Sequence, residues 1–362
     1  MAAIAPTIWT ADQFKTASTP DNIFKRHRGT EIQLIDQTLV RVDALRHQGA
    51  SDQQKHLAIH QIVVACKNWL NAKGNKTTAA ATKRKEAVES LGEQAFQWIK
   101  WYKFHERKSN RPAGFANLRD MRPGYKRERD LYVASAKRQN PVSGSYVHAI
   151  MESREHEQFA GRTFANLTMA DFRQLDNASV GEVNQVDPMG DPGSMAKVKM
   201  PRMVLFLNKQ ERVKRLVIVQ HGLLYEGFDK PLNASPAHCV AFVIDKYGNI
   251  YSSTETFDKR YSFNHSTFNA GKEVICAGTL GARQGQLALF TNNSGHYKPT
   301  RQNMHDGLRF IENAEIDLSH TVVWVNEPDP ARPGKLINHE YRVARTFLNN
   351  INAVPDLSTP EP

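Results

Sequence analysis

The sequence predicts an α+β protein in which an N-terminal helical bundle precedes an antiparallel β-rich domain with one packed helix. Two patterns lead to this prediction. Apolar residues recur every three or four positions over roughly 30–105, as in amphipathic helices, and every second position after residue 200, as in strands. The length of 362 residues and the apolar fraction of 40% suit about two domains, each with its own core.

Three helices are predicted in the front part. Residues 30–33 (TEIQ) and 51–54 (SDQQ) both have the S/T-x-x-E/Q form of a capping box, which satisfies free backbone donors at the start of a helix. A third helix is expected over roughly 80–105. Helices of this kind with short links predict a bundle.

Short β-branched segments follow residue 200, with tight links at 245–249 and 282–285 whose glycines suit hairpin turns. Strands joined by such short links must be antiparallel. One helix, with Thr300 as its N-cap, precedes a last strand at 320–325. The predicted organisation is a loose arm (1–29), a basic helical domain (30–145), an irregular linker (146–200), the β domain (201–326) and a frayed tail (327–362).

The positive charge is concentrated in the front part of this basic protein. The net charge is +11, and residues 1–140 hold 25 Lys and Arg against 13 Asp and Glu. A basic segment favours an acidic protein or nucleic acid as partner. Aromatic and basic residues alternate over 98–108, which would suit single-stranded nucleic acid. Helical spacing, however, assigns Trp98 and Tyr102 to the core and leaves only Trp101 and Phe104 unexplained, so nucleic acid is not favoured.

Several features point to a cytoplasmic location in the producing cell. No apolar run is long enough to span a membrane, and the N-terminus lacks the pattern of a signal peptide. Three widely spaced cysteines predict reduced thiols. Delivery to a target cell by a signal-peptide-independent secretion system remains open. The sequence contains no metal-binding motif and identifies no cofactor.

The most unusual string is SGHYKPT at 294–300, which joins a strand to a helix; FNHSTFNAG lies upstream at 263–271. Gly295 permits a sharp bend and Pro299 an extended entry into the helix. His296 and Tyr297 are therefore expected at a rigid junction, which we interpret as a candidate site.

Histidine is the usual side chain for proton transfer at neutral pH. The candidate catalytic residues are His265, Ser266, Ser294, His296 and Tyr297. The candidate binding residues, which include carboxylates able to orient an imidazole, are Tyr251, Glu255 and Asp258. The alternative is structural: His296 and its neighbours would form hydrogen bonds that hold the junction together.

The two strings and the strands between them resemble the C-terminal part of the plant IQ-motif-containing calmodulin-binding (IQM) proteins, over roughly 213–325. They are also similar to domains of bacterial toxin and secreted-effector proteins. The matching positions are Tyr251, Phe263, His265, Ser266, Phe268, Ala270, Gly271, Ala277, Gly278 and 294–299. The bacterial resemblance implies a toxin-like virulence effector with an immunity or chaperone protein as partner, and the plant resemblance implies calmodulin.

Two functions are therefore expected. The first is a secreted effector or toxin-like protein whose β domain presents the His/Ser/Tyr site, with an unknown reaction. The second is a non-catalytic binding protein that uses its basic helical region for an acidic protein or nucleic acid. The IQ motif itself is incomplete, because Ile32–Gln33 is followed by Gln37 where a basic residue is needed and by Arg41 one place early.

Overall fold

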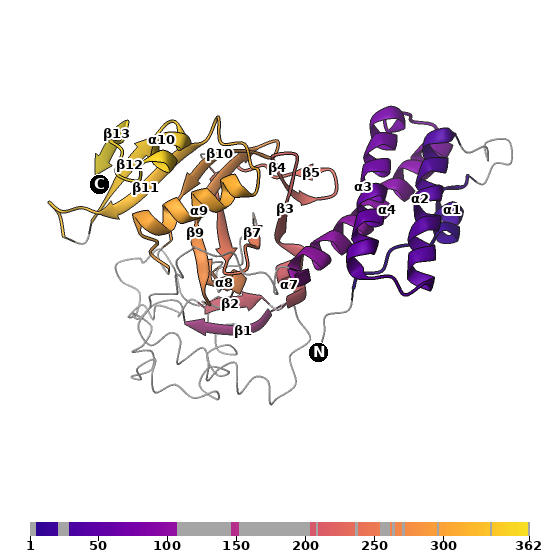
Figure 1. Cartoon of the computed structure of the whole chain (residues 1–362), viewed down its shortest axis with the longest axis horizontal. Helices are drawn as coiled ribbons and strands as arrows, with labels where there is room; N and C mark the ends of the chain where they lie inside the picture. The colour runs from indigo at the N-terminus through magenta and orange to yellow at the C-terminus, as the bar shows by residue number, and fades with distance from the viewer. Residues whose placement is uncertain are drawn as a thin grey trace, which may run out of the picture.

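The computed structural model confirms an α+β protein with N-terminal helices followed by a large sheet (Figure 1). It describes residues 5–20, 29–106, 146–151, 203–207, 209–235, 238–253, 261–262, 265–269, 272–294, 297–333 and 335–360. No helix in these ranges is both long and apolar enough to cross a membrane.

The helical part is a bundle of α1 (Ala11–Ser18), α2 (Thr30–His47), α3 (Asp52–Lys73) and α4 (Ala79–Glu106). The residues predicted for the apolar faces are buried, as the 3–4 spacing requires. They include Ile35, Leu39, Ile62, Cys66 and Leu91. The expectation of a loose arm at 1–29 is wrong for its central part, because α1 packs against α4 and buries Phe14.

Of the two capping boxes predicted in the bundle, the structure contains the one at Ser51. Ser51 Oγ accepts a hydrogen bond from the backbone N–H of Gln54, whose side chain accepts one from Ser51 N–H. The box predicted at Thr30 is wrong, because Gly29 is the N-cap and Thr30 is already helical. A box of the same form joins Thr10 to Gln13 at the start of α1.

The main sheet has ten strands in the order β13-β12-β11-β10-β9-β6-β7-β3-β4-β5. The pair β10–β11 is parallel, so the sheet of the predicted antiparallel β-rich domain is mixed. Helix α9 (Arg301–Asn313), capped by Thr300 as predicted, supplies the crossover that a parallel return needs. The strands are β3 (Leu216–Gln220), β4 (Leu223–Gly227), β5 (Lys230–Pro231), β6 (Val240–Asp245), β7 (Ile250–Ser253), β9 (Val274–Arg283), β10 (Gln286–Thr291), β11 (Val322–Pro328), β12 (Leu336–Tyr341) and β13 (Leu357–Pro360).

A smaller sheet combines β1 (Tyr146–Met151), β2 (Met203–Leu207) and β8 (Tyr261–Ser262). Its first strand corrects the expectation of an irregular linker over 146–200, of which 152–200 lie outside the described residues. Two short helices follow strands of this sheet: α7 (Lys209–Lys214) and α8 (His265–Asn269).

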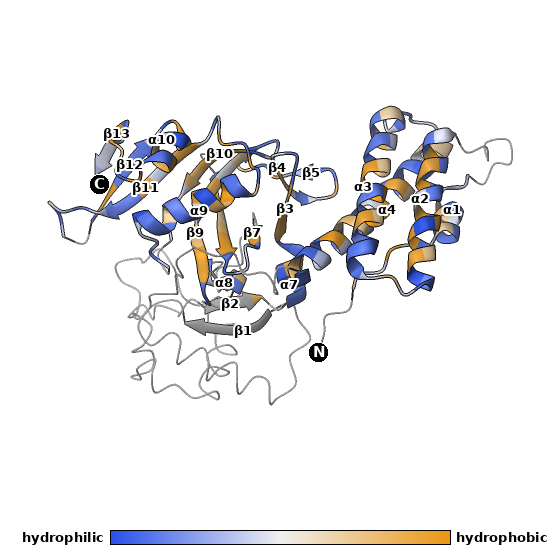
Figure 2. Cartoon of the chain, in the orientation of Figure 1, coloured by the Kyte–Doolittle hydropathy of each residue, from blue (hydrophilic) through white to orange (hydrophobic). Residues whose placement is uncertain are grey.

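The expectation of a frayed tail at 327–362 is also wrong. The three prolines of this segment mark the end of β11 and the turn after it, and the chain then returns as β12. Helix α10 (Ala344–Asn349) buries Phe347, and β13 pairs with β12. Figure 2 shows that the central strands β9 and β10 are rich in hydrophobic residues, whereas β12 is mostly hydrophilic.

The two faces of the main sheet belong to different cores, because alternate residues of a strand point to opposite faces. On β6, Val243 lies in the core shared with α1–α4, whereas Phe242 and Ile244 lie in the core covered by α9 and α10. The helical bundle and one face of the sheet therefore share a single core.

Helix α4 belongs to both parts of this shared core. It packs in the bundle, and its C-terminal half lies beside α7 and β3 (Figure 1). The fully buried ammonium group of Lys100 donates hydrogen bonds to the carbonyl oxygens of Lys214, at 2.7 Å, and Glu226. A carboxylate oxygen of Glu93 accepts one from the backbone N–H of Phe228 at 3.0 Å. Both contacts join α4 to the β region.

Candidate functional site

His265 is the first residue of α8 and lies against β9. Its Nε2 is 2.7 Å from the carbonyl oxygen of Gly278. Because a carbonyl only accepts, Nε2 must carry the proton and donate it. Burial lowers the pKa of His265 to about 4, and the Gly278 hydrogen bond only partly opposes that shift. The imidazole is therefore neutral near pH 7 and a weak base for proton transfer at that pH.

Gly278 is the point at which α8 and the strand leading to the SGHYKPT string approach β9. A Cβ at this position would lie 1.9 Å from the backbone oxygen of Thr291, so only glycine allows the strands to come this close. On the neighbouring residues the hydroxyl groups of Thr279 and Thr291 are 2.8 Å apart. This close packing explains the Ala277–Gly278 pair of the sequence pattern.

Tyr297 and Ser294 form hydrogen bonds within the fold. The Tyr297 side chain is fully buried, and its hydroxyl donates to the carbonyl oxygen of Lys272 at 2.9 Å. Ser294 Oγ accepts from Tyr297 N–H at 3.3 Å. Since Lys272 follows α8 closely in the chain, Tyr297 joins the two signature strings as a buried contact.

Tyr251, a predicted binding residue, is also fully buried on β7. Its hydroxyl donates to Asp245 Oδ2 at 3.0 Å. The same carboxylate accepts from Asn249 Nδ2 at 3.0 Å and from the backbone N–H groups of Tyr247 and Asn249, both at 2.9 Å. Asp245 thus holds the β6–β7 hairpin, and Tyr251 is one of its donors.

The structure therefore places five of the eight predicted site residues. Ser266 is fully buried on α8, beside His265. His296, Glu255 and Asp258 lie outside the described residues, so the convergence of His265 and His296 remains a prediction. The catalytic assignment also remains a prediction, whereas the hydrogen bonds of Tyr251, Ser294 and Tyr297 correspond to the structural alternative.

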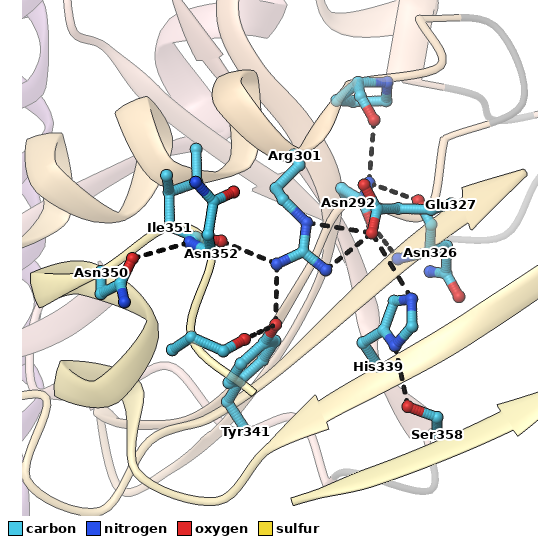
Figure 3. A network of polar contacts seen from close by, with 12 residues as sticks. Asn292, Arg301, Asn326, Glu327, His339, Tyr341, Asn350, Ile351, Asn352 and Ser358 are labelled. Atoms are coloured by element: carbon cyan, nitrogen blue, oxygen red, sulfur yellow. Dashed lines mark hydrogen bonds and ion pairs between the residues drawn. The ribbon is translucent and has the colours of Figure 1, made fainter. Parts of the chain in front are cut away.

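A second polar centre lies around Arg301 at the start of α9, directly after the SGHYKPT string in the chain, and the sequence analysis did not predict it (Figure 3). The Arg301 guanidinium group donates to Glu327 Oε2 at 2.9 and 2.7 Å, and to the hydroxyl of Tyr341 and the carbonyl oxygen of Ile351, both at 2.7 Å. His339 Nε2 lies 3.5 Å from the same Glu327 oxygen.

Asn292 completes this centre by joining β10 to β11. Its side-chain oxygen accepts from Asn326 N–H at 2.7 Å, and its amide donates to the carbonyl oxygens of Pro299 and Asn326 at 2.8 and 2.9 Å (Figure 3). The residues of this centre come from four separate segments (292–301, 326–327, 339–341 and 351), so no local spacing in the sequence predicts that they meet.

None of the three cysteines forms a disulfide bond, and burial raises the pKa of all three thiols. This environment disfavours the reactive thiolate form. No group of three or more His, Cys, Asp or Glu suited to a metal ion occurs in the part of the chain that the structure describes.

The fold and the buried junction define an α+β protein whose signature strings pack helix α8 and the start of α9 onto a mixed sheet. In comparison with known proteins, residues 211–304 match the IQ motif-containing protein middle domain. The predicted resemblance to the plant IQM proteins is confirmed for this region, whereas the comparisons do not show the resemblance to bacterial toxin and effector domains. No solved structure matches the chain.

The matching relatives are plant proteins. The chain is 32% identical to the IQ domain-containing protein IQM1 of Arabidopsis thaliana over 139 residues, which are 36% of this chain and 28% of that protein. IQM4 is 30% identical over 36% of this chain and 26% of its own length, and IQM2 is 29% identical over 41% and 24%. The chain thus spans about a quarter of the length of each relative.

These matches correct the first expected function. Because the relatives are plant IQ domain-containing proteins, the expectation of a bacterial, secreted, toxin-like virulence effector is wrong. An immunity or chaperone protein as partner has no support. The second expectation, a non-catalytic binding protein, agrees better with the relatives.

Proposed function

We propose that the chain is a non-catalytic binding protein for an acidic protein partner, with the β region as its scaffold. The observation that carries this proposal is that signature residues are buried and form hydrogen bonds within the fold. The Tyr251 and Tyr297 hydroxyl groups donate to partners within the fold, and both side chains are fully buried.

The charge distribution supports an acidic partner. Residues 107–140, which lie outside the described residues, contain ten Lys and Arg against three Asp and Glu. Residues 29–106, which form α2–α4 and their links, contain eleven Lys and Arg against eight Asp and Glu, so most of the basic excess lies outside these helices. The predicted basic helical domain (30–145) therefore carries most of its excess charge in a part that lies outside the described residues.

Nucleic acid is a weaker candidate. Of the rings that suggested stacking, Trp98, Tyr102 and Phe104 are at most 9% exposed and belong to the shared core, and Trp101 is partly buried against that core. Base stacking needs an accessible ring face.

Calmodulin is the acidic protein to test first, because the IQM resemblance implies it. The helix that carries the incomplete IQ string cannot offer its apolar face to calmodulin in the folded protein, because Ile32, Ile35 and Leu39 are buried in the bundle. Binding to α2 would require the bundle to open, which favours a site elsewhere on the chain.

The test measures binding of the purified full chain to calmodulin, with and without Ca²⁺, and to a peptide of glutamate and leucine residues. We expect saturable binding of at least one probe that weakens as salt increases. His265→Gln and Tyr297→Phe should bind with affinity within about twofold of the original protein, since neither side chain serves the proposed interface. Failure of every acidic probe to bind would overturn the proposal.

A further inference from the structure

Helix α3 exposes a stripe in which apolar and basic residues alternate at helical spacing. Leu57, His60, Val64 and Lys67 follow one another at intervals of three, four and three residues, so their side chains lie along one face. Leu57 is 65% exposed and Val64 42% exposed, whereas His60 and Lys67 are half-buried. Exposed large apolar residues in such a row mark an interaction surface more often than isolated ones do.

The stripe continues across the junction to the β region. The Lys67 ammonium group lies 4.1 Å from the centre of the Tyr225 ring on β4. The exposed His221, in the turn between β3 and β4, is close enough to His60 to contribute to the lowering of the His60 pKa. The surface therefore involves α3 and the β3–β4 hairpin together.

The carboxylate of Asp229, in the exposed turn between β4 and β5, is close enough to Lys67 to favour its charged form. Two other carboxylates near the stripe form ion pairs. Lys103 on α4 pairs with Glu106 at 3.8 Å, and Asp52 pairs with Lys55 at 3.4 Å. His56 stacks on Tyr102 with ring centroids 4.4 Å apart, and its buried Nε2 has no hydrogen-bond partner among the described residues. Among the described residues, no hydrogen bond or ion pair joins a carboxylate to His60 or His221, whereas Glu106 is close enough to His56 to favour its charged form.

We propose that the α3 stripe, extended by His221, is the docking surface for an acidic segment of a partner protein that also carries apolar side chains. The partner's apolar groups would cover Leu57 and Val64, and its carboxylates would pair with His60, Lys67 and His221. This inference rests on the proposed function and adds the site and the chemistry of the partner.

Docking of a carboxylate should be coupled to protonation of His60. Burial lowers the pKa of His60, and His221, Lys103 and Lys67 add to this effect. His56, whose pKa is lowered to about 4 mainly by burial, is the remaining titratable neighbour, with its ring 6.4 Å from that of His60. An incoming carboxylate raises the pKa of His60, so binding takes up protons and strengthens as the pH falls.

The experiment uses the full chain and a labelled 16-residue peptide of glutamate and leucine, with leucines at every third or fourth position. Leu57→Ser/Val64→Ser should weaken binding about tenfold or more, as loss of central apolar contacts does. The matched control Leu34→Ser/Val40→Ser removes two similarly exposed apolar residues from α2 and should change the affinity less than about twofold.

The proton coupling is tested between about pH 7.5 and pH 6. The original protein should gain about three- to tenfold in affinity over this range, because uptake of one proton changes affinity by at most tenfold per pH unit. His60→Gln/His221→Asn should lose that gain, whereas His47→Gln/His320→Gln, which removes two exposed histidines elsewhere, should keep it. Asparagine suits position 221, whose φ is 51°.

Equal effects of the test and control pairs on binding would overturn the docking site while leaving the proposed function intact. Thermal unfolding within about 3 °C of the original protein shows that a variant has kept its fold. If the peptide and calmodulin both fail to bind the original protein, the proposed function fails as well.

Discussion

Tyr297 shows how a polar signature residue can serve the fold. Its ring lies in the core shared by the bundle and the sheet, and its hydroxyl satisfies the carbonyl oxygen of Lys272. Tyr297 is fully buried, and a buried hydroxyl without a hydrogen-bond partner is costly, so this hydrogen bond stabilises the junction of the two signature strings.

Replacing Tyr297 by phenylalanine should therefore lower the free energy of unfolding by about 1–2 kcal/mol. Tyr247→Phe, at a half-exposed position, is the matched control and should change it by less than about 0.5 kcal/mol. Urea denaturation measures both values. Equal effects of the two substitutions would contradict the structural role of Tyr297.

Lys100 has two acceptors for its three N–H groups, and its third N–H has no acceptor in the described structure. Burial is the main cause that lowers its pKa from 10.5 to about 8, although Glu93 and Glu226 favour the charged form. The neutral amine, with two N–H donors, would match the two carbonyl oxygens.

This shift predicts a pH dependence of stability. Between pH 8 and 10.5 the unfolded chain binds more protons at this residue than the folded protein, so the free energy of unfolding rises with pH. Relative to Lys100→Met, the original protein should gain about 2 kcal/mol from pH 8 to about pH 9.5. Chemical denaturation at each pH measures the difference, and a constant difference would show that Lys100 does not titrate in this range.

At the scale of elements, Arg301 fixes the C-terminal strands onto the sheet. Its guanidinium group contacts β11 through Glu327, β12 through Tyr341 and the segment after α10 through Ile351 (Figure 3). The planar group with several donors suits this arrangement, whereas an ammonium group at the end of a flexible chain does not.

Arg301→Lys should therefore cost about 2 kcal/mol of stability and increase hydrogen exchange in β12 and β13 first. Arg345→Lys, which changes an exposed arginine paired with Glu312 at 2.8 Å, should cost less than about 0.5 kcal/mol. Hydrogen-exchange mass spectrometry with denaturation measures both effects. Unchanged exchange in β12 would contradict the proposed role of Arg301.

At the scale of the whole molecule, the bundle and the sheet should unfold together, because they share one core. Phe228 of the β region packs against Gly92 of α4, where a Cβ would lie 2.3 Å from the ring. Lys100 and Glu93 add polar contacts across the same junction. Within the described residues, the apolar core therefore runs from the bundle into the β region without a break.

Phe228→Ala should accordingly lower the stability of both parts by a similar amount, about 3–5 kcal/mol. Hydrogen exchange of peptides from α2–α3 and from β9–β10, followed in increasing denaturant, reports on each part separately. A shift confined to one part would show that the bundle and the sheet are independent folding units.

The sequence by itself determined the local features of this protein. The 3–4 apolar spacing predicts α2–α4, the SDQQ string and Thr300 predict two helix starts, and alternation predicts most strands of the sheet. Gln284 and Gly285, with φ of 50° and 81°, form the predicted hairpin turn. These signals depend on neighbours within about four residues, so they can be read along the chain.

Only the tertiary structure decided the parallel pairing of β10 with β11, the packing of the C-terminal segment and the use of the signature residues. Tyr297 looks like a displayed polar group in the sequence, yet it is buried because α8 returns beside it. Lys100 bonds to carbonyls 114 and 126 residues away, and Arg301 to a carbonyl 50 residues away. Such partners are brought together only by the arrangement of whole elements, which local spacing does not encode.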